Sequence, residues 1–240
     1  MSEVVCSDRD EAEVTVRLAA RALARAGLVG AYGHCSVRLS SNELLVCTSK
    51  AMGTILPSDV GTVVPIIGAL PNDVLGEVRV HQQIYQRRPD VGAICRVFPP
   101  NVLTMSVIGE APECRHGLSA FFYPRPAYWD DARLMRTDEL AAGAADTLGQ
   151  NAGIILRGNG AVVAATSMQR ALALCVYLED MCRLELAVRA NRASATAPVL
   201  TQAEADVRAN WNGRVEQRMW DHWTFGDAEQ GSLKREAISA

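Results

Sequence analysis

The sequence contains few lysines and no paired cysteines. Lys50 and Lys234 are the only two lysines among 240 residues, so few side chains could form a Schiff base, which requires a lysine amine. The seven cysteines are widely spread and include no C-x-x-C pair, which argues against a disulfide framework and against a zinc ribbon. A formal net charge of -3 provides no basic field, so nucleic-acid binding is not expected.

Long apolar segments are also absent from the sequence. No run approaches the roughly 20 residues that a membrane-spanning helix requires. The first residues, MSEVVCSDRDEAEV, are acidic and polar, unlike a signal peptide. Hydrophobic residues make up 49% and charged residues 21% of the chain, which is typical of a globular protein with a substantial core. We therefore expect a cytoplasmic protein with no membrane partner.

The hydrophobic periodicity predicts helices that alternate with short strands. Predicted helices run from a capping Ser7 to Gly27 and over 77–88, 101–109, 137–149 and 168–191, and one more precedes a Trp-rich tail. Predicted strands cover 35–40, 43–49, 91–98, 152–160 and 161–167, with a turn into a further strand over 56–67. This pattern indicates one α/β domain with helices packed on a mixed sheet.

The C-terminal segment forms a separate part of the prediction. The domain is expected to cover residues 1–195, and residues 196–240 are expected to form a helix and tail that pack on the domain or on a neighbouring subunit. The tail aromatics are too many for a solvated end, and aromatic anchors are enriched at protein contacts. We therefore expect the following residues to pack on a neighbouring subunit: Trp211, Trp220, Trp223 and Phe225.

Four segments, taken in order and spacing, resemble a known family. These are GHCSVR (33–38), the pair Gly76-Glu77 with His81 followed by IYQRRPDVGAI (84–94), RGNGAVV (157–163), and a helix over 177–186 that contains Glu179. From about residue 12 to 190 the chain resembles the class II aldolase/adducin family. The sequence motif around GHCSVR resembles the decarboxylase-like branch of that family more than the sugar-phosphate aldolases.

The resemblance implies a fold, an assembly and a chemistry. It implies a three-layer αβα domain with a central mixed, mainly antiparallel sheet, commonly in a homotetramer with active sites between neighbouring subunits. Working members bind a small-molecule substrate through a divalent metal, usually zinc, held by two histidines at a strand end and a third in the glycine turn. The metal polarises a carbonyl and stabilises an enediolate. A glutamate at the position of Glu77 acts as acid and base.

This sequence departs from the family at the metal. The three histidine positions are occupied by Arg96, Phe98 and Asn159. Arginine stays protonated and cannot ligate a cation, and phenylalanine has no donor atom. We therefore expect neither a metal nor another cofactor. The phosphate-binding loops are altered as well, with Ser49-Lys50 and Leu75-Gly76 in their places, so a phosphorylated sugar is not the preferred substrate.

The candidate site residues follow from these positions. The predicted catalytic residues are Glu77, Arg96 and His34, and the predicted substrate-binding residues are Gly33, Ser49, Lys50, His81, His116 and Asn159. Arg96 could replace the metal electrostatically by binding a carboxylate or enolate with two hydrogen bonds, while Glu77 or a histidine handles the proton. Structural roles stay open beside these: a salt bridge from Arg96 to Glu77, cavity filling by Phe98, and a tight turn at Asn159.

Three functions are compatible with these residues. The first is a metal-independent lyase that performs decarboxylation, aldol-type cleavage or related enolate chemistry on a small carboxylated or carbonyl substrate, in a specialised biosynthetic pathway. The second is a non-catalytic oligomeric scaffold or ligand-binding protein. The third is a metal-dependent lyase with ligands recruited from His34, His81 or His116.

Overall fold

The computed structural model describes residues 8–233, which form one seven-stranded sheet flanked by helices. The helices are α1 (Arg9–Arg25), η1 (Met52–Thr54), η2 (Gly76–Val78), α2 (Arg79–Arg87), α3 (Pro100–Ile108), η3 (Gly117–Phe122), α4 (Asp138–Leu148), α5 (Met168–Ala190), α6 (Gln202–Arg208) and α7 (Val215–Thr224). The strands are β1 (His34–Arg38), β2 (Glu43–Val46), β3 (Thr62–Pro65), β4 (Ala93–Val97), β5 (Ala127–Trp129), β6 (Gly153–Leu156) and β7 (Ala161–Ala165).

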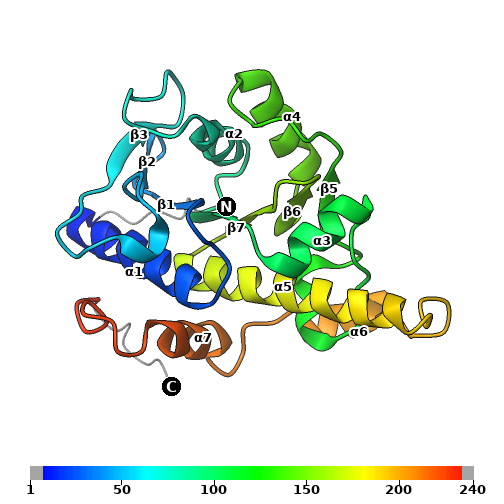
Figure 1. Ribbon diagram of the computed structural model, residues 1–240. Coiled ribbons are helices and arrows are strands. Elements are labelled where there is room, and N and C mark those ends of the chain that lie inside the picture. The colour runs from blue at the N-terminus through cyan, green and yellow to red at the C-terminus, as the bar shows by residue number, and fades with distance from the viewer. Residues whose placement is uncertain (1–7, 234–240) are drawn as a thin grey trace.

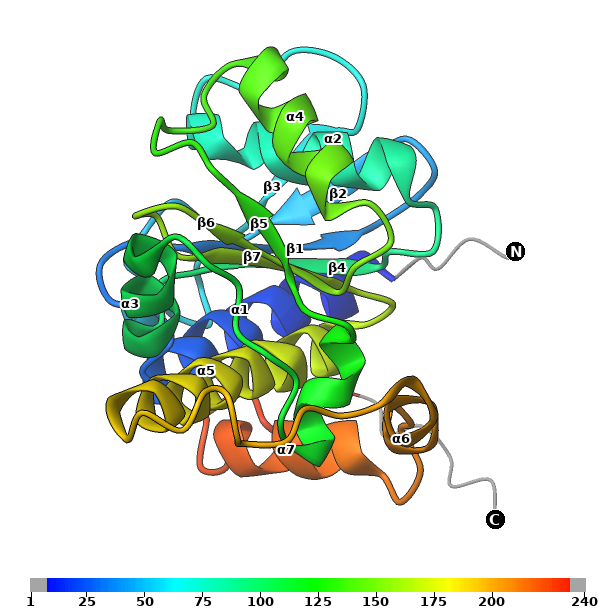
Figure 2. The ribbon, with the colours of Figure 1, turned by 90° about the vertical axis from the view of Figure 1, so that its right-hand side faces the viewer.

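The sheet has the strand order β3-β2-β1-β4-β7-β6-β5, and every neighbouring pair is antiparallel except β5 and β6. Helices α2 and α4 cover one face, and α1 and α5 cover the other, with α7 outside them (Figures 1 and 2). The predicted three-layer αβα domain with a mixed, mainly antiparallel sheet is therefore confirmed. No helix between residues 8 and 233 is long and apolar enough to cross a bilayer.

Alternation along β1 explains how polar groups enter the layer beneath α2. Successive strand side chains point to opposite faces. Cys35 and Val37 join the apolar core under α1 and α5. The residues between and beside them, His34, Ser36 and Arg38, face α2, where each contacts His81 or Tyr85. One face of a central strand is thus polar although all five of its residues are buried.

Several element boundaries differ from the prediction. Helix α2 begins at Arg79, and Glu77 lies in the preceding 3₁₀ turn η2, so Glu77 and His81 are not on one α-helix as expected. Ser7 lies outside the described residues, and Asp8 caps α1 by accepting from the backbone amides of Asp10 and Glu11. Strand β5 was not predicted because three residues are too few to show an alternating pattern.

The C-terminal segment forms two helices, α6 and α7, where a helix and a tail were predicted. Trp220 is buried in the core that α1 and α5 share, and Trp211 and Trp223 pack against that core. These tryptophans pack on the domain of their own chain, which is one of the two alternatives expected for the tail. Phe225 differs from them, with 79% of its surface exposed.

Helix α3, which follows the end of β4, is held at its first turn by a side chain from α5. The carboxylate of Glu179 accepts hydrogen bonds from the backbone amides of Asn101 and Val102 and from Asn101 Nδ2, at 2.7–3.1 Å. A carboxylate at this place satisfies amides that have no partner within the helix and interacts well with the helix dipole. Glu179 therefore positions the segment that follows β4.

Replacing Glu179 with alanine should destabilise the protein by about 1–3 kcal/mol, because the first amides of α3 lose their acceptor. Urea unfolding would measure this loss. Asp180→Ala is the control, since Asp180 is a neighbour on α5 that makes a surface ion pair with Arg183, and it should change stability by less than about 0.5 kcal/mol. Equal effects of the two variants would contradict a capping role for Glu179.

Candidate active site

The predicted site residues gather where β1 begins and β4 ends. His34 and Arg96 are directly opposite each other in the antiparallel pair. Gly33 precedes His34 with φ +131°, and a Cβ there would lie 3.0 Å from the carbonyl oxygen of Arg96. Only glycine combines this backbone conformation with so close an approach. The GHCSVR segment therefore brings its histidine directly against the position where the resemblance places a metal.

The guanidinium of Arg96 is completely buried and only partly hydrogen bonded. Nη1 donates to the carbonyl oxygens of Val97 at 3.1 Å and Ala161 at 3.4 Å. Nε and Nη2 have no hydrogen-bond partner among the described residues. The ring of Phe98 stacks on the guanidinium, with its centroid 4.1 Å from Cζ. Phe98 is therefore both a filler and a cation–π partner of the cation.

Glu77 reaches the same place from η2, and Asn159 reaches it from the turn between β6 and β7. Glu77 Oε1 lies 3.7 Å from Arg96 Nη2, an ion pair that is too long for a hydrogen bond. Asn159 Nδ2 donates weakly to Glu77 Oε1 at 3.5 Å. The carboxylate of Glu77 is 16% exposed and Arg96 is fully covered, so the carboxylate lies between the cation and the solvent. Because the ion pair is long, the Arg96 guanidinium can exchange Glu77 for another negatively charged group.

The turn that carries Asn159 depends on one glycine. Gly160 has φ +70°, and a Cβ there would lie 2.2 Å from the carbonyl oxygen of Val97. Gly158 also has a positive φ, +63°, but a Cβ there would meet nothing within 4 Å. The turn can therefore approach β4 closely at Gly160 alone, and that approach brings Asn159 to Glu77.

A pair of imidazoles lies beside the cation, between β1 and α2. The ring centroids of His34 and His81 are 4.6 Å apart. His81 Nδ1 is 2.7 Å from Ser36 Oγ, which in turn lies 3.0 Å from the hydroxyl of Tyr85. Ser36 and Tyr85 were missed as site residues. Their signal was spacing, because Ser36 is two residues from His34 on a strand and Tyr85 is four residues from His81 on a helix.

The environment opposes charge on these groups. Burial, and next the charge of Arg96, lower the pKa of His34 to about 3. Burial also lowers the pKa of His81, assisted by His34 and Arg96. Burial lowers the pKa of Arg96 to about 10, although Glu77 opposes this change. At neutral pH the cluster thus contains one fixed cation and two neutral imidazoles.

Three other predicted substrate-binding residues make contacts elsewhere. Lys50 is paired with Asp59 at 2.6 Å, and Ser49 Oγ donates to the carbonyl oxygen of Asp73 at 3.4 Å. His116 caps η3, and the charges that affect its pKa are those of Asp180, Arg183 and Arg208. Burial is the main cause of the lowered pKa of His116. Within the described chain, none of these three side chains has a contact with Glu77 or Arg96.

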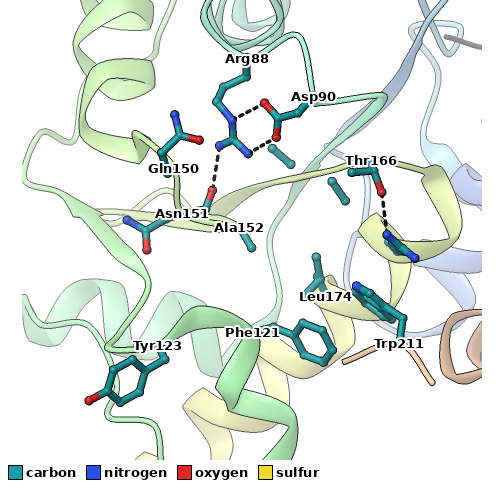
Figure 3. A pocket seen from close by; sticks show the side chains of 13 residues that line it. Arg88, Asp90, Phe121, Tyr123, Gln150, Asn151, Ala152, Thr166, Leu174 and Trp211 are labelled. Atoms are coloured by element: carbon teal, nitrogen blue, oxygen red, sulfur yellow. Dashed lines mark hydrogen bonds and ion pairs between the residues drawn. The ribbon is translucent and has the colours of Figure 1, made fainter. Parts of the chain in front are cut away.

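A cavity of about 240 Å³ lies at the opposite end of the central strands β4 and β7 (Figure 3). Ala165, the last residue of β7, lines the cavity and pairs with Ala93, the first residue of β4. Arg96 lies near the other end of β4. Figure 3 shows Phe121 beside Trp211 on one wall and the Arg88–Asp90 ion pair on another. None of the polar cluster lines this cavity. The cavity is therefore separate from the candidate active site.

Fold and site together define an αβα enzyme-like domain whose polar cluster lies at a strand end, beside a glycine turn. The chain belongs to the class II aldolase and adducin family, because the family model for the Class II Aldolase and Adducin N-terminal domain matches residues 15–186.

Relatives and solved structures point to the same family. The chain is 28% identical over 237 residues to a 3,4-dihydroxyphthalate decarboxylase of Arthrobacter keyseri, with 88% of this chain and 92% of the relative covered. It is 29% identical over 202 residues to a protein of the same name from Rhodococcus jostii (strain RHA1), with coverages of 76% and 82%. In structure it resembles L-fuculose 1-phosphate aldolase from Glaciozyma antarctica PI12, with a TM-score of 0.74, 21% identity and coverages of 90% and 88%. That last likeness concerns the fold alone.

The donor atoms at this place do not fit the divalent metal that the family resemblance implies. Arg96 supplies only N–H donors, Phe98 supplies no ligand atom, and the Asn159 amide is directed to Glu77. His34 and His81 keep free ring nitrogens, but a buried cation lies beside them and would repel a metal ion. Among residues 8–233, no group of three or more His, Cys, Asp or Glu side chains could hold a metal.

Gly160→Ala should destabilise the protein more than Gly158→Ala. Both variants place a Cβ on a left-handed backbone, at a cost of about 1–2 kcal/mol. Gly160→Ala adds a clash with the Val97 carbonyl and should cost at least about 2 kcal/mol more. Urea unfolding of the two variants measures the difference. Identical midpoints would mean that the approach of the turn to β4 is not tightly constrained.

The stability of the protein should fall as pH decreases below about 6.5. The unfolded chain binds a proton at His34 near that pH, whereas the folded chain, with a pKa of about 3, does not. Each such histidine contributes a loss of up to about 1.4 kcal/mol per pH unit. His34→Gln should make the dependence shallower in thermal unfolding between pH 5 and 7. His222→Gln, a change at an exposed residue, should leave the slope unaltered.

Proposed function

We propose that this protein is a lyase that works without a metal ion and decarboxylates a small, hydroxylated aromatic carboxylate. Arg96 carries the positive charge, Glu77 handles the proton, and Asn159 orients Glu77. The proposal rests chiefly on one observation, the buried guanidinium of Arg96, whose Nε and Nη2 atoms make no hydrogen bond to the described residues. The relatives named 3,4-dihydroxyphthalate decarboxylase support the substrate class.

These two atoms of Arg96 form one edge of the guanidinium fork. Such an edge can donate two hydrogen bonds to a negatively polarised oxygen group. Arg38 shows how a buried guanidinium is otherwise satisfied in this protein, since it donates to the carbonyl oxygens of Val91, Tyr85 and Arg88. A purely structural Arg96 would be expected to find such acceptors. The free edge supports a ligand in their place.

The chemistry follows from where charge develops. The ring carbon that carries the departing carboxylate first takes a proton from Glu77, while a substrate hydroxyl gives up its proton and becomes a ketone. The C–C bond then breaks, CO₂ leaves, and the electron pair passes through the restored ring onto that oxygen, which takes its proton back. A cation is most useful beside that oxygen, because holding the departing carboxylate would stabilise the starting state instead. The proton from Glu77 thus takes the place of CO₂ on the ring, and Glu77 recovers a proton from solvent.

Family members are commonly oligomeric, and we propose that this chain forms a homotetramer. A neighbouring subunit would cover the exposed side of Glu77 and could contribute His116 to the site. This would explain why His116 lies apart from the cluster within one chain.

A second candidate function is a ligand-binding or scaffold role without catalysis. The stacking of Phe98 on Arg96 favours it, because the ring closes one side of the guanidinium. A lyase with a metal bound to His34, His81 and His116 has less support, since the first two lie beside the cation and the third lies by the charges of Asp180 and Arg208.

The test measures CO₂ release from 3,4-dihydroxyphthalate and other hydroxylated aromatic carboxylates labelled with ¹³C in the carboxylate. Protein treated with a chelator should keep its activity. Arg96→Gln and Glu77→Gln should each lower kcat/KM by about 100-fold, because the first removes the cation and the second removes the proton carrier.

Arg87→Gln is the matched control, since Arg87 lies on α2 and is paired with Asp146 at the surface. It should leave kcat/KM unchanged. Activity that depends on stoichiometric zinc would overturn the metal-independent mechanism. If the wild-type protein binds these acids tightly and neither it nor any variant releases CO₂, the result would support the non-catalytic candidate instead.

A further inference from the structure

Between β1 and α2 the structure contains a buried set of polar side chains that the proposed decarboxylation does not explain. His34, Ser36, His81, Tyr85 and Arg96 are at most 3% exposed. Five polar atoms in this set have no hydrogen-bond partner among the described residues: both ring nitrogens of His34, His81 Nε2, Arg96 Nε, and Arg96 Nη2, whose only ion pair there is the long one to Glu77. Buried polar groups are nearly always satisfied, so this concentration indicates a missing oxygen atom.

The hydroxyls of Ser36 and Tyr85 determine which nitrogen of His81 carries its proton. Three contacts join these residues: Ser36 Oγ to His81 Nδ1 at 2.7 Å, Ser36 Oγ to Tyr85 Oη at 3.0 Å, and Tyr85 Oη to the Ser36 carbonyl oxygen at 3.1 Å. Each contact requires one hydrogen, and each hydroxyl has only one to give. The third must therefore come from His81 Nδ1.

The three hydrogen bonds therefore run in one direction, from His81 to Ser36 to Tyr85. His81 Nδ1 donates to Ser36 Oγ, Ser36 donates to Tyr85 Oη, and Tyr85 donates to the Ser36 carbonyl oxygen. His81 is neutral because burial and the neighbouring charges lower its pKa. Its Nε2 atom is then a bare acceptor, in a ring that packs against His34 and is close enough to Arg96 for that charge to lower its pKa.

We propose that Arg96 and His81 form a buried site for one hydroxyl oxygen, which accepts from the Arg96 Nε–Nη2 edge and donates its hydrogen to His81 Nε2. Two donors from a cation and one acceptor from a neutral imidazole match a hydroxyl, and they do not match an aliphatic group. The oxygen comes from a substrate hydroxyl or, without substrate, from a water molecule. Ser36 and Tyr85 are positioning residues that keep Nε2 free of hydrogen.

The site gives the proposed enzyme its preference for hydroxylated substrates, and to that extent it rests on the proposed function. A hydroxyl held between Arg96 and His81 is polarised, since the guanidinium stabilises developing negative charge on its oxygen. Once the ring carbon is protonated and the hydroxyl hydrogen has passed to His81 Nε2, this oxygen is a ketone that accepts the electron pair of the breaking C–C bond, and the hydrogen then returns to it. Removing that hydroxyl from a ligand should weaken binding by about 10-fold or more, as expected for a hydrogen bond to a charged group.

The first experiment locates the proton of His81 by ¹⁵N NMR of wild-type protein without ligand. We expect hydrogen on Nδ1 and none on Nε2. A hydrogen on Nε2 overturns the proposal, whatever the variants do. Tyr85→Phe keeps the ring but removes the acceptor for the Ser36 hydrogen, so it should shift His81 towards the other tautomer.

The second experiment compares the affinity of 3,4-dihydroxyphthalate with that of phthalate, which lacks both hydroxyls. Wild-type protein should bind the first at least about 10-fold more tightly. Ser36→Ala should reduce this ratio towards one while its affinity for phthalate stays unchanged. An unaltered ratio in a folded Ser36→Ala protein overturns the proposal. If that variant does not fold, Tyr85→Phe is measured in the same way.

Crystals grown with and without 3,4-dihydroxyphthalate identify the source of the oxygen. Density between Arg96 and His81 Nε2 from a water or from a ligand hydroxyl supports the site, and its absence from both crystals overturns it. Failure here is distinguishable from failure of the proposed function. A protein that discriminates between the two ligands but releases no CO₂ contradicts only the decarboxylase. One that releases CO₂ with hydrogen on His81 Nε2 contradicts only the hydroxyl site.

Discussion

The burial of one positive charge, the guanidinium of Arg96, is the constraint on which the rest of the site depends. Removing a cation from water costs several kcal/mol unless other groups replace the lost interactions. Here two carbonyl oxygens, the Phe98 ring and the distant carboxylate of Glu77 replace only part of them. The Nε–Nη2 edge of Arg96, which makes no hydrogen bond to the described residues, can therefore donate to an oxygen atom that reaches it.

The groups around Arg96 avoid adding a second positive charge next to it. His34 and His81 are kept neutral beside it, so their nitrogens can act as hydrogen-bond partners without adding a second positive charge. Glu77 is the one carboxylate paired with it among the described residues, and it lies on the solvent side. In the function proposed here, electrostatic stabilisation, proton transfer and recognition are divided among separate side chains, in a place where the family resemblance implies a metal.

The surrounding structure holds these groups in place with hydrogen bonds and close backbone contacts. Glu179 fixes the start of α3 after β4, and Gly160 allows the β6–β7 turn to reach Val97. On β1, Arg38 fastens the end of α2 through the carbonyl oxygens of Tyr85 and Arg88. These contacts fix three backbone segments near the cluster, the start of α3, the β6–β7 turn and the end of α2.

Prediction from the sequence succeeded where local patterns carry the information. Strand alternation, capping residues and the motif order gave the sheet, most helices and the residues His34, Glu77, Arg96 and Asn159, which do meet in space. It left alternatives open where the outcome depended on contacts between distant segments. The tryptophans of the last forty residues could pack on any apolar surface, and their own chain supplied the nearest one.

The sequence by itself determined that Arg96, Phe98 and Asn159 stand where the family resemblance implies three metal-binding histidines, and side-chain identity alone decides which atoms can ligate. Tertiary structure alone decided what those replacements form together. Only in the folded chain does Phe98 stack on Arg96, does Glu77 stop short of a hydrogen bond, and does Ser36 meet His81 across β1 and α2. These relations depend on distances of a few ångströms between segments far apart in the chain, and sequence spacing does not encode such distances.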